Sequence, residues 1–121
     1  MSNRGLLSPF LKNTNYTDRY GDIRAIPLVT KTAAFTIERK DNGVGFSVSA
    51  GITIPLNLQV GFSCTLYNDT ATAVTITITS GVTARASASA TTKTSFSLVP
   101  YGMASVWCNK LNNFVLAGDI A

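Results

Sequence analysis

The chain has 121 residues and a mass of 12.8 kDa, which is the size of one domain. Its net charge is only +4 at pH 7. Charged residues make up 13% of the sequence, against about 25% in typical soluble domains, and hydrophobic residues make up 45%, which excludes a wholly disordered chain. No apolar run approaches the ~20 residues of a membrane helix, and the first residues lack the apolar core of a signal peptide. We therefore expect no membrane partner and folding in a cytoplasm.

Residues 1–32 differ from the remainder because their five basic side chains oppose only two aspartates. No helical or strand period continues there for more than a few residues, so we predict an extended attachment arm, with a solvated tail as the alternative. The basic charges are spread out, which favours docking on protein over binding to nucleic acid. The residues expected to make the contacts of the arm are Arg4, Leu6, Leu7, Phe10, Tyr16, Arg19, Tyr20 and Arg24.

The β region is expected to begin at residue 33. In the first run Phe35, Ile37 and Arg39 alternate with Ala34, Thr36 and Glu38. Asp41-Asn42-Gly43 then predicts a tight turn into a returning strand at 46–48. The next short strand, 52–54, ends at Pro55, which cannot donate a hydrogen bond to a neighbouring strand.

The strongest strand signals lie at residues 60–67 and 74–79, which alternate strictly between apolar and polar side chains. In the first run the predicted dry face begins with Val60. The turn residues Asn68-Asp69-Thr70 join the two runs and predict an antiparallel hairpin, because they bond their own backbone and tolerate left-handed angles.

The small residues of 86–92 are interpreted as a loop, with a flat strand packed against another copy as the alternative. Alternation returns at 95–98, and an Asn-rich linker between 104–108 and 114–117 predicts a hairpin that holds the last strand in a sheet. Short strands at regular spacing predict an all-β fold, an antiparallel β-sandwich or small barrel over residues 33–121 with an extended N-terminal arm.

The two cysteines, Cys64 and Cys108, lie in alternating strand patterns and are interpreted as small buried hydrophobes. A disulfide between them is the alternative, and it would require an oxidising compartment that nothing in the sequence indicates. Two cysteines without any histidine do not suggest a zinc site, and we expect no metal and no cofactor.

Catalytic chemistry has little support in this sequence. It contains no histidine and a single glutamate, Glu38, and most of its aspartates lie in turn motifs, so we predict no catalytic residues and no enzyme activity. Tyr101, Trp107 and Asp119 are candidates for contact with another subunit or with a glycan. In structural terms, Tyr101 would be an exposed turn residue, Trp107 a core or interface aromatic residue, and Asp119 the residue that ends a strand.

A series of motifs in residues 33–121 resembles a β module of tailed-bacteriophage virion proteins, found in tail-fibre, head-fibre and capsid-decoration proteins. The motifs are Ile52-Thr53-Ile54-Pro55, Val60-Gly61-Phe62, the Thr/Ile strand ending at Ser80-Gly81-Val82, and Trp107 followed by Phe114-Val115-Leu116-Ala117-Gly118-Asp119-Ile120. The arm has no matching motif.

The resemblance implies a non-enzymatic virion subunit that is homotrimeric and is attached to other capsid or tail proteins through its N-terminal segment. Within that class we expect a capsid-decoration protein or a head- or tail-fibre adaptor, assembled in the host cytoplasm and located in the virion. The alternative function is a module at a fibre tip that binds a glycan of the host surface.

Overall fold

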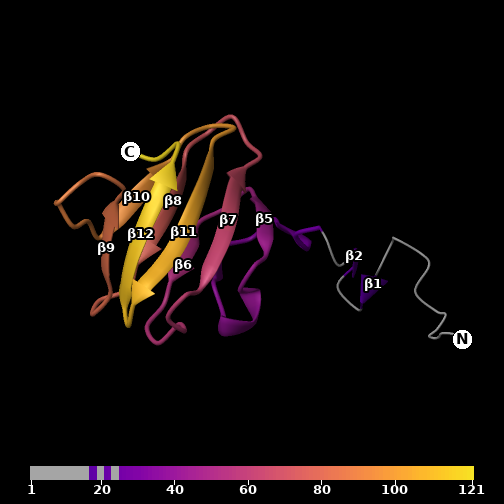
Figure 1. Ribbon diagram of the computed structural model, residues 1–121. Coiled ribbons are helices and arrows are strands. Elements are labelled where there is room, and N and C mark those ends of the chain that lie inside the picture. The colour runs from indigo at the N-terminus through magenta and orange to yellow at the C-terminus, as the bar shows by residue number, and fades with distance from the viewer. Residues whose placement is uncertain (1–16, 19–20, 23–24) are drawn as a thin grey trace, which may run out of the picture.

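The computed structural model describes residues 17–18, 21–22 and 25–121, and within them the fold is all-β, as predicted. Strands β1 (Thr17–Asp18) and β2 (Gly21–Asp22) pair only with each other. The remaining strands form two sheets that pack face to face as a sandwich (Figure 1).

The larger sheet has six strands in the order β3-β5-β7-β11-β12-β9, and the smaller has four in the order β10-β8-β6-β4. The six-stranded sheet contains β3 (Leu28–Lys31), β5 (Gly45–Val48), β7 (Ser63–Asn68), β11 (Met103–Lys110), β12 (Asn113–Gly118) and β9 (Thr83–Ala86). The four-stranded sheet contains β10 (Ser95–Leu98), β8 (Val74–Ile78), β6 (Ile52–Ile54) and β4 (Phe35–Thr36).

From β3 to β11 the chain crosses to the opposite sheet after every strand. As a result β3, β5 and β7 are parallel to one another, and so are β4, β6 and β8. The pairs β7–β11, β11–β12 and β8–β10 are antiparallel. Both sheets are therefore mixed, whereas the sequence pattern predicted antiparallel pairing throughout.

The predicted hairpin between residues 60–67 and 74–79 is wrong, because β7 and β8 belong to different sheets. Asn68, at the end of β7, has a fully buried side chain that bonds to both sides of the connection. Its Oδ1 accepts a hydrogen bond from the Thr70 N–H at 3.1 Å, as expected of such a turn, but its Nδ2 donates to the carbonyls of Leu98 and Val99, each at 3.1 Å. The turn residues therefore lead the chain across the sandwich.

The predicted hairpin around Asp41-Asn42-Gly43 is wrong for a similar reason, because β4 and β5 also lie in different sheets. Residues Arg39–Asp41 form a 3-10 turn, which we call η1, in place of the continued strand. The backbone N–H of Glu38 donates to Asp41 Oδ2 at 2.8 Å, which caps this turn and ends the extended conformation.

Val60 is 61% exposed and does not belong to the dry face of β7, which begins only at Ser63. The Phe62 N–H donates to the Gln59 carbonyl at 3.0 Å, and Gly61 has a positive φ of 89°. This turn directs Val60 outward and Phe62 into the core, so the alternating pattern extends too far toward the N-terminus.

The predicted hairpin at the C-terminal end is confirmed by the antiparallel pair β11–β12, and residues after Ala86 form a loop, as predicted. Strand β3 lies inside the range expected to be the arm, since it pairs with β5 from Leu28 onward.

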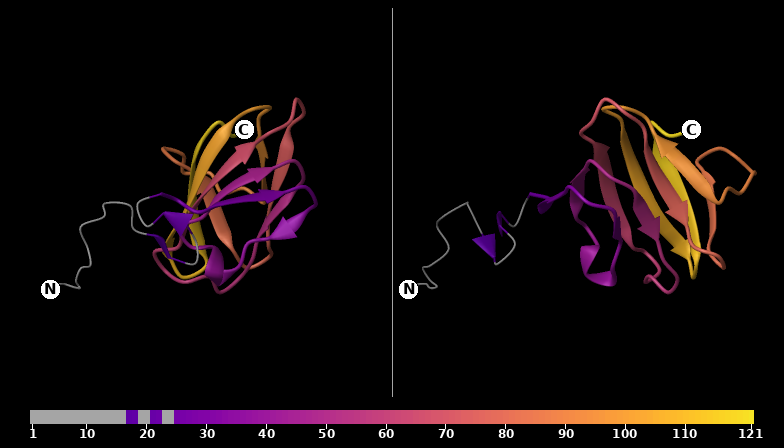
Figure 2. Two further views of the ribbon diagram at one scale, coloured as in Figure 1. Left: turned by 90° about the vertical axis from the view of Figure 1, so that its right-hand side faces the viewer. Right: turned by 180° about the vertical axis from the view of Figure 1, so that it is seen from behind.

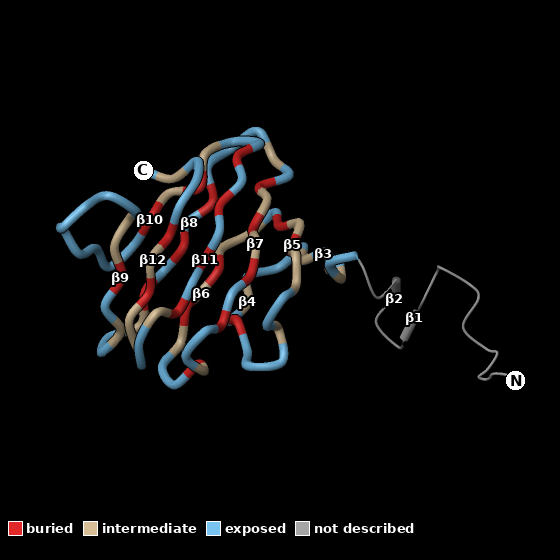
Figure 3. Tube along the Cα trace, in the orientation of Figure 1, coloured by how far each residue is buried: buried red, intermediate tan, exposed pale blue. Residues whose placement is uncertain are grey.

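The core lies between the two sheets, where buried residues alternate with outward-facing ones along the strands (Figure 3). Two layers are visible in Figure 2, whose left panel looks onto the end of the sandwich where residues 25–48, in purple, lie. The largest fully buried side chains are Phe46, Phe62, Phe114, Ile37, Ile52, Ile54, Leu58, Leu66, Ile76, Leu98, Leu116 and Val48.

Candidate interaction surface

The outward side of the six-stranded sheet is a broad surface with little charge, and we call it the outer face. Alternate residues of each strand point to it, because successive side chains of a strand point to opposite sides of the sheet. The registers of the six strands place on it Leu28, Thr30, Gly45, Ser47, Ser63, Thr65, Tyr67, Thr83, Arg85, Met103, Ser105, Trp107, Val115 and Ala117. Arg85 is the only charged member of this set.

Trp107 lies on β11 between Ser63 of β7 and Val115 of β12, and its side chain remains 51% exposed. On the same strand Met103 lies opposite Tyr67 and is 54% exposed. Tryptophan, tyrosine, methionine and arginine are enriched in protein–protein interfaces, and charged residues are depleted from interface cores. Tyr67, Arg85, Met103 and Trp107 are therefore residue types that favour a protein interface, and they lie among small and hydroxyl side chains.

The outward side of the four-stranded sheet differs from the outer face in the kind of side chain that it presents. Its side chains, given by the registers of β4, β6, β8 and β10, are Thr36, Thr53, Thr75, Thr77, Ser95 and Ser97. Small hydroxyl residues fit a solvated β surface and offer little apolar area to a partner. The two sides of the sandwich therefore differ in the apolar area that they expose.

Of the predicted contact residues, Trp107 lies on the outer face and Tyr101 does not. Tyr101 occupies the turn before β11 with a φ of 56° and is 60% exposed. Five residues lie between the two along the chain, and only Trp107 belongs to β11. The two candidates therefore lie on different elements, one in a turn and one on a strand.

Asp119 lies just beyond β12 and is bound to its own chain. Its Oδ2 accepts a hydrogen bond from the Met103 N–H at 3.1 Å, and its backbone N–H donates to the Met103 carbonyl at 2.8 Å. These bonds continue the pairing between β11 and the end of the chain, so the side chain has a structural role at this position.

The predicted arm contacts lie outside the residues that the structure describes. They are Arg4, Leu6, Leu7, Phe10, Tyr16, Arg19, Tyr20 and Arg24.

Sequence reasoning missed the contributions of Tyr67, Arg85 and Leu28 to the outer face. The signal for Tyr67 was present, because it occupies an outward position in the alternation of β7. Leu28 and Arg85 join the face only through the parallel pairs β3–β5 and β9–β12. Such pairs connect strands that are not joined by a tight turn, so no local sequence motif predicts them.

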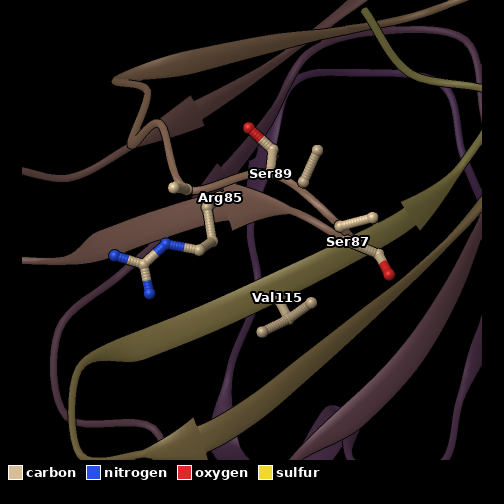
Figure 4. A pocket seen from close by; sticks show the side chains of 7 residues that line it. Arg85, Ser87, Ser89 and Val115 are labelled. Atoms are coloured by element: carbon tan, nitrogen blue, oxygen red, sulfur yellow. The ribbon is translucent and has the colours of Figure 1, made fainter.

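Two hollows lie at opposite ends of the sandwich. One, of about 470 Å³, is formed by β9, the loop after it and Val115 of β12. Figure 4 shows Arg85, Ser87 and Ser89 around it. The Nε of Arg85 is buried and has no hydrogen-bond partner. Arg85 is the only charged residue that lines this hollow, so the hollow lacks the several charged side chains that would hold a charged ligand.

The second hollow, which we call the open-end cleft, has a volume of about 530 Å³ and lies between the edge strands β3 and β4. Its apolar lining residues are Pro27, Val29, Phe35 and Val44, and its charged lining residues are Lys31, Glu38, Lys40 and Asp41. The cleft therefore combines an apolar surface with two cations and two carboxylates.

The two cysteines are free and buried. Burial, together with a smaller contribution from the negative charge of Asp41, raises the pKa of Cys64 from 9.0 to about 12. The thiol of Cys108 donates to the Lys110 carbonyl at 3.0 Å. A thiol that ionises only at very high pH is a poor nucleophile, so the environment of Cys64 is that of a core residue.

Within the part of the chain that the structure describes, no cluster of three or more His, Cys, Asp or Glu side chains could hold a metal ion. The same residues contain no helix with the length and apolar character needed to cross a membrane. Comparison with known proteins gave no matching family model, no matching curated protein and no matching solved structure.

Proposed function

We propose that this chain is a non-enzymatic structural subunit of a phage particle that binds copies of itself through the outer face. The observation that supports this most strongly is the composition of that face. Met103, Trp107 and Leu28 are each more than half exposed on it, and Arg85 is its only charge. Burying the exposed half of Trp107 alone would remove about 100 Å² from water, worth about 2–3 kcal/mol.

The assignment to a virion rests on the resemblance of the motifs between Ile52 and Ile120 to phage structural modules. In this proposal three copies associate, residues 1–32 attach the subunit to another capsid or tail protein, and the subunit decorates a capsid or adapts a fibre. A three-fold ring uses different patches on the two sides of each contact. The broad outer face, which extends over six strands, offers room for two such patches.

The test introduces a charge at the centre of the outer face. Ser105 is exposed on β11, between Thr65 of β7 and Ala117 of β12, so Ser105→Lys adds a long cation without disturbing the core. Light scattering of the full chain after gel filtration should show an oligomer for the wild type and loss of the outer-face contact for Ser105→Lys. A buried unpaired charge costs several kcal/mol, so the dissociation constant should rise at least 100-fold.

The matched control is Thr77→Lys, which adds the same side chain to an exposed position of β8 on the opposite side of the sandwich. It should retain the wild-type mass. A wild-type chain that is monomeric at high micromolar concentration would contradict the proposal, and so would an oligomer that both variants leave intact.

A further inference from the structure

The outer edge of β3 presents backbone groups without a partner in the described part of the chain. The carbonyls of Pro27 and Lys31 accept hydrogen bonds from the N–H groups of Gly45 and Ser49 at 2.9 and 3.0 Å, so these carbonyls point toward β5. Backbone groups alternate in direction along a strand, and those of Leu28 and Thr30 therefore point away from β5. Both residues are exposed, and β3 ends the six-stranded sheet.

This edge is self-complementary about a two-fold axis through Val29. If β3 of a second copy lies antiparallel with Val29 opposite Val29, Leu28 of each copy faces Thr30 of the other. Both residues offer an outward N–H and an outward C=O, so the two strands can exchange a full set of hydrogen bonds. A two-fold contact requires the same patch on both copies, and this register satisfies that requirement.

The lining of the open-end cleft is also consistent with a second copy of this chain as the partner of β3. Val29 lines the cleft, so the two Val29 side chains would meet on the axis and extend the apolar surface of each cleft. The cleft also carries two cations, Lys31 and Lys40, and two carboxylates, Glu38 and Asp41. A second copy related by a two-fold axis presents the same balanced set in the opposite direction, so that each sign can meet the other.

Exposed apolar side chains beside the edge provide the remaining driving force. Leu28, the first residue of β3, is 74% exposed, and Ile26, just before the strand, is 64% exposed. In the two-fold register each Leu28 side chain lies on the outer face next to Thr30 of the other copy. Burial of apolar area on both sides of the axis would add to the hydrogen bonds of a short strand, which alone are weak.

We propose that β3 is a second self-association site, at which two copies pair antiparallel through Leu28 and Thr30 and join their six-stranded sheets into one continuous sheet. The proposal rests on the proposed function in so far as both take the partner to be a copy of this chain. It adds a two-fold contact to the contact through the outer face, so each contact can be removed without the other.

The test replaces Thr30 with proline in the full chain. Proline removes the outward N–H and leaves the pairing of β3 with β5 intact, because that pairing uses the neighbouring residues. The mass from light scattering should fall to half the wild-type value, and the dissociation constant of the two-fold contact should rise at least tenfold. An unchanged mass would overturn the proposal.

The matched control is Thr36→Pro, at an exposed position of the other free edge strand, β4. The N–H groups of Phe35 and Ile37 donate to Gly51 and Thr53 of the β6 side at 3.1 Å, so the Thr36 N–H also points outward. This variant should keep the wild-type mass. A loss of association equal to that of Thr30→Pro would overturn pairing through β3 specifically.

Amide hydrogen exchange of the unmodified chain tests the proposal even if a proline variant does not fold. The amides of Leu28 and Thr30 should be protected at high protein concentration and exchange at least tenfold faster after dilution. Protection that does not depend on concentration would mean that the chain covers this edge itself, and absence of protection would mean that the edge stays free. Either result overturns the proposal, whereas association through the outer face is judged separately by Ser105→Lys.

Discussion

The two ends of the sandwich differ in how their edge strands are covered. At the end formed by β9 and β10 the chain returns over its own edges: the Lys93 N–H donates to the Ala84 carbonyl at 2.9 Å, and Ala121 exchanges two hydrogen bonds with Ser97. At the end formed by β3 and β4, no described segment pairs with the outer edges. Uncovered edges invite pairing with another chain, so we infer that the open end is the one that receives a partner.

Each edge strand of the four-stranded sheet carries a phenylalanine with a lysine above its ring. At the closed end the ammonium of Lys93 lies 5.4 Å from the ring centre of Phe96, and at the open end that of Lys31 lies 5.1 Å from Phe35. The cation–π contacts are therefore similar. Phe96 is only 2% exposed, however, whereas Phe35 is partly buried and lines the open-end cleft.

The largest expected effect separates these two rings. Phe96→Ala should lower the free energy of unfolding by about 3–5 kcal/mol, because it leaves a cavity in a closed core. Phe35→Ala should lower it by about 1–2 kcal/mol, because part of that ring already contacts water. Urea unfolding at a concentration where the chain is monomeric measures both. Equal losses would show that the open end is as tightly packed as the closed end.

Two asparagines give the next comparison. Asn68 is fully buried, and its Nδ2 donates to the Thr72, Leu98 and Val99 carbonyls at 2.8–3.1 Å, which joins β7 to the end of β10. Asn68→Ala should cost about 2–3 kcal/mol, because it leaves buried carbonyls without a donor.

The control, Asn42→Ala, removes an exposed side chain near the open end whose Oδ1 accepts one hydrogen bond, from the Ser63 N–H at 3.0 Å. Water can replace that bond, so the cost should stay near 0.5–1 kcal/mol. Thermal unfolding followed by circular dichroism measures both variants. A larger loss for Asn42→Ala would contradict the ranking of the two ends.

These residues also show how far the sequence predicts the fold. Alternation correctly marks β8, β10, β11 and β12, because the period of two is a local property that follows from which side chains meet the core. It extends too far after β4 and before β7, where η1 and a turn replace the expected strand. It does not show which sheet a strand joins. Asn68 illustrates the limit, since its turn chemistry is readable but its bonds to Leu98 and Val99 connect residues 30 and 31 apart.

The candidate surface is predictable to a similar degree. Trp107 and Met103 stand out because they alternate with small core residues along one strand. The places of Leu28 and Arg85 on the outer face depend on the register of the parallel pairs β3–β5 and β9–β12, which a sequence does not encode locally. The open-end cleft was not predicted, because it forms between strands of different sheets.

The buried thiol of Cys64 gives the last comparison, because Cys64 lies on β7 in the middle of the sheet but is influenced by Asp41 of the open end. The folded-state pKa is about 12, compared with 9.0 for an exposed thiol. Below pH 9 the thiol is neutral in both states, and its contribution to stability is fully present. As the pH rises from 9 toward 12, the unfolded chain loses the proton while the folded chain keeps it. The free energy of unfolding should therefore fall by about 1.4 kcal/mol per pH unit in this window.

Cys64→Ala separates this effect from the ionisation of other groups, because it has no thiol at this site. The difference in unfolding free energy between the wild type and this variant should shrink steadily above pH 9. In Asp41→Asn the decline should begin at the same pH and end at a lower one, because removing the carboxylate lowers the folded-state pKa of Cys64. Parallel curves for the wild type and Cys64→Ala would mean that the core around β7 admits water, and that the open end is looser than its packing indicates.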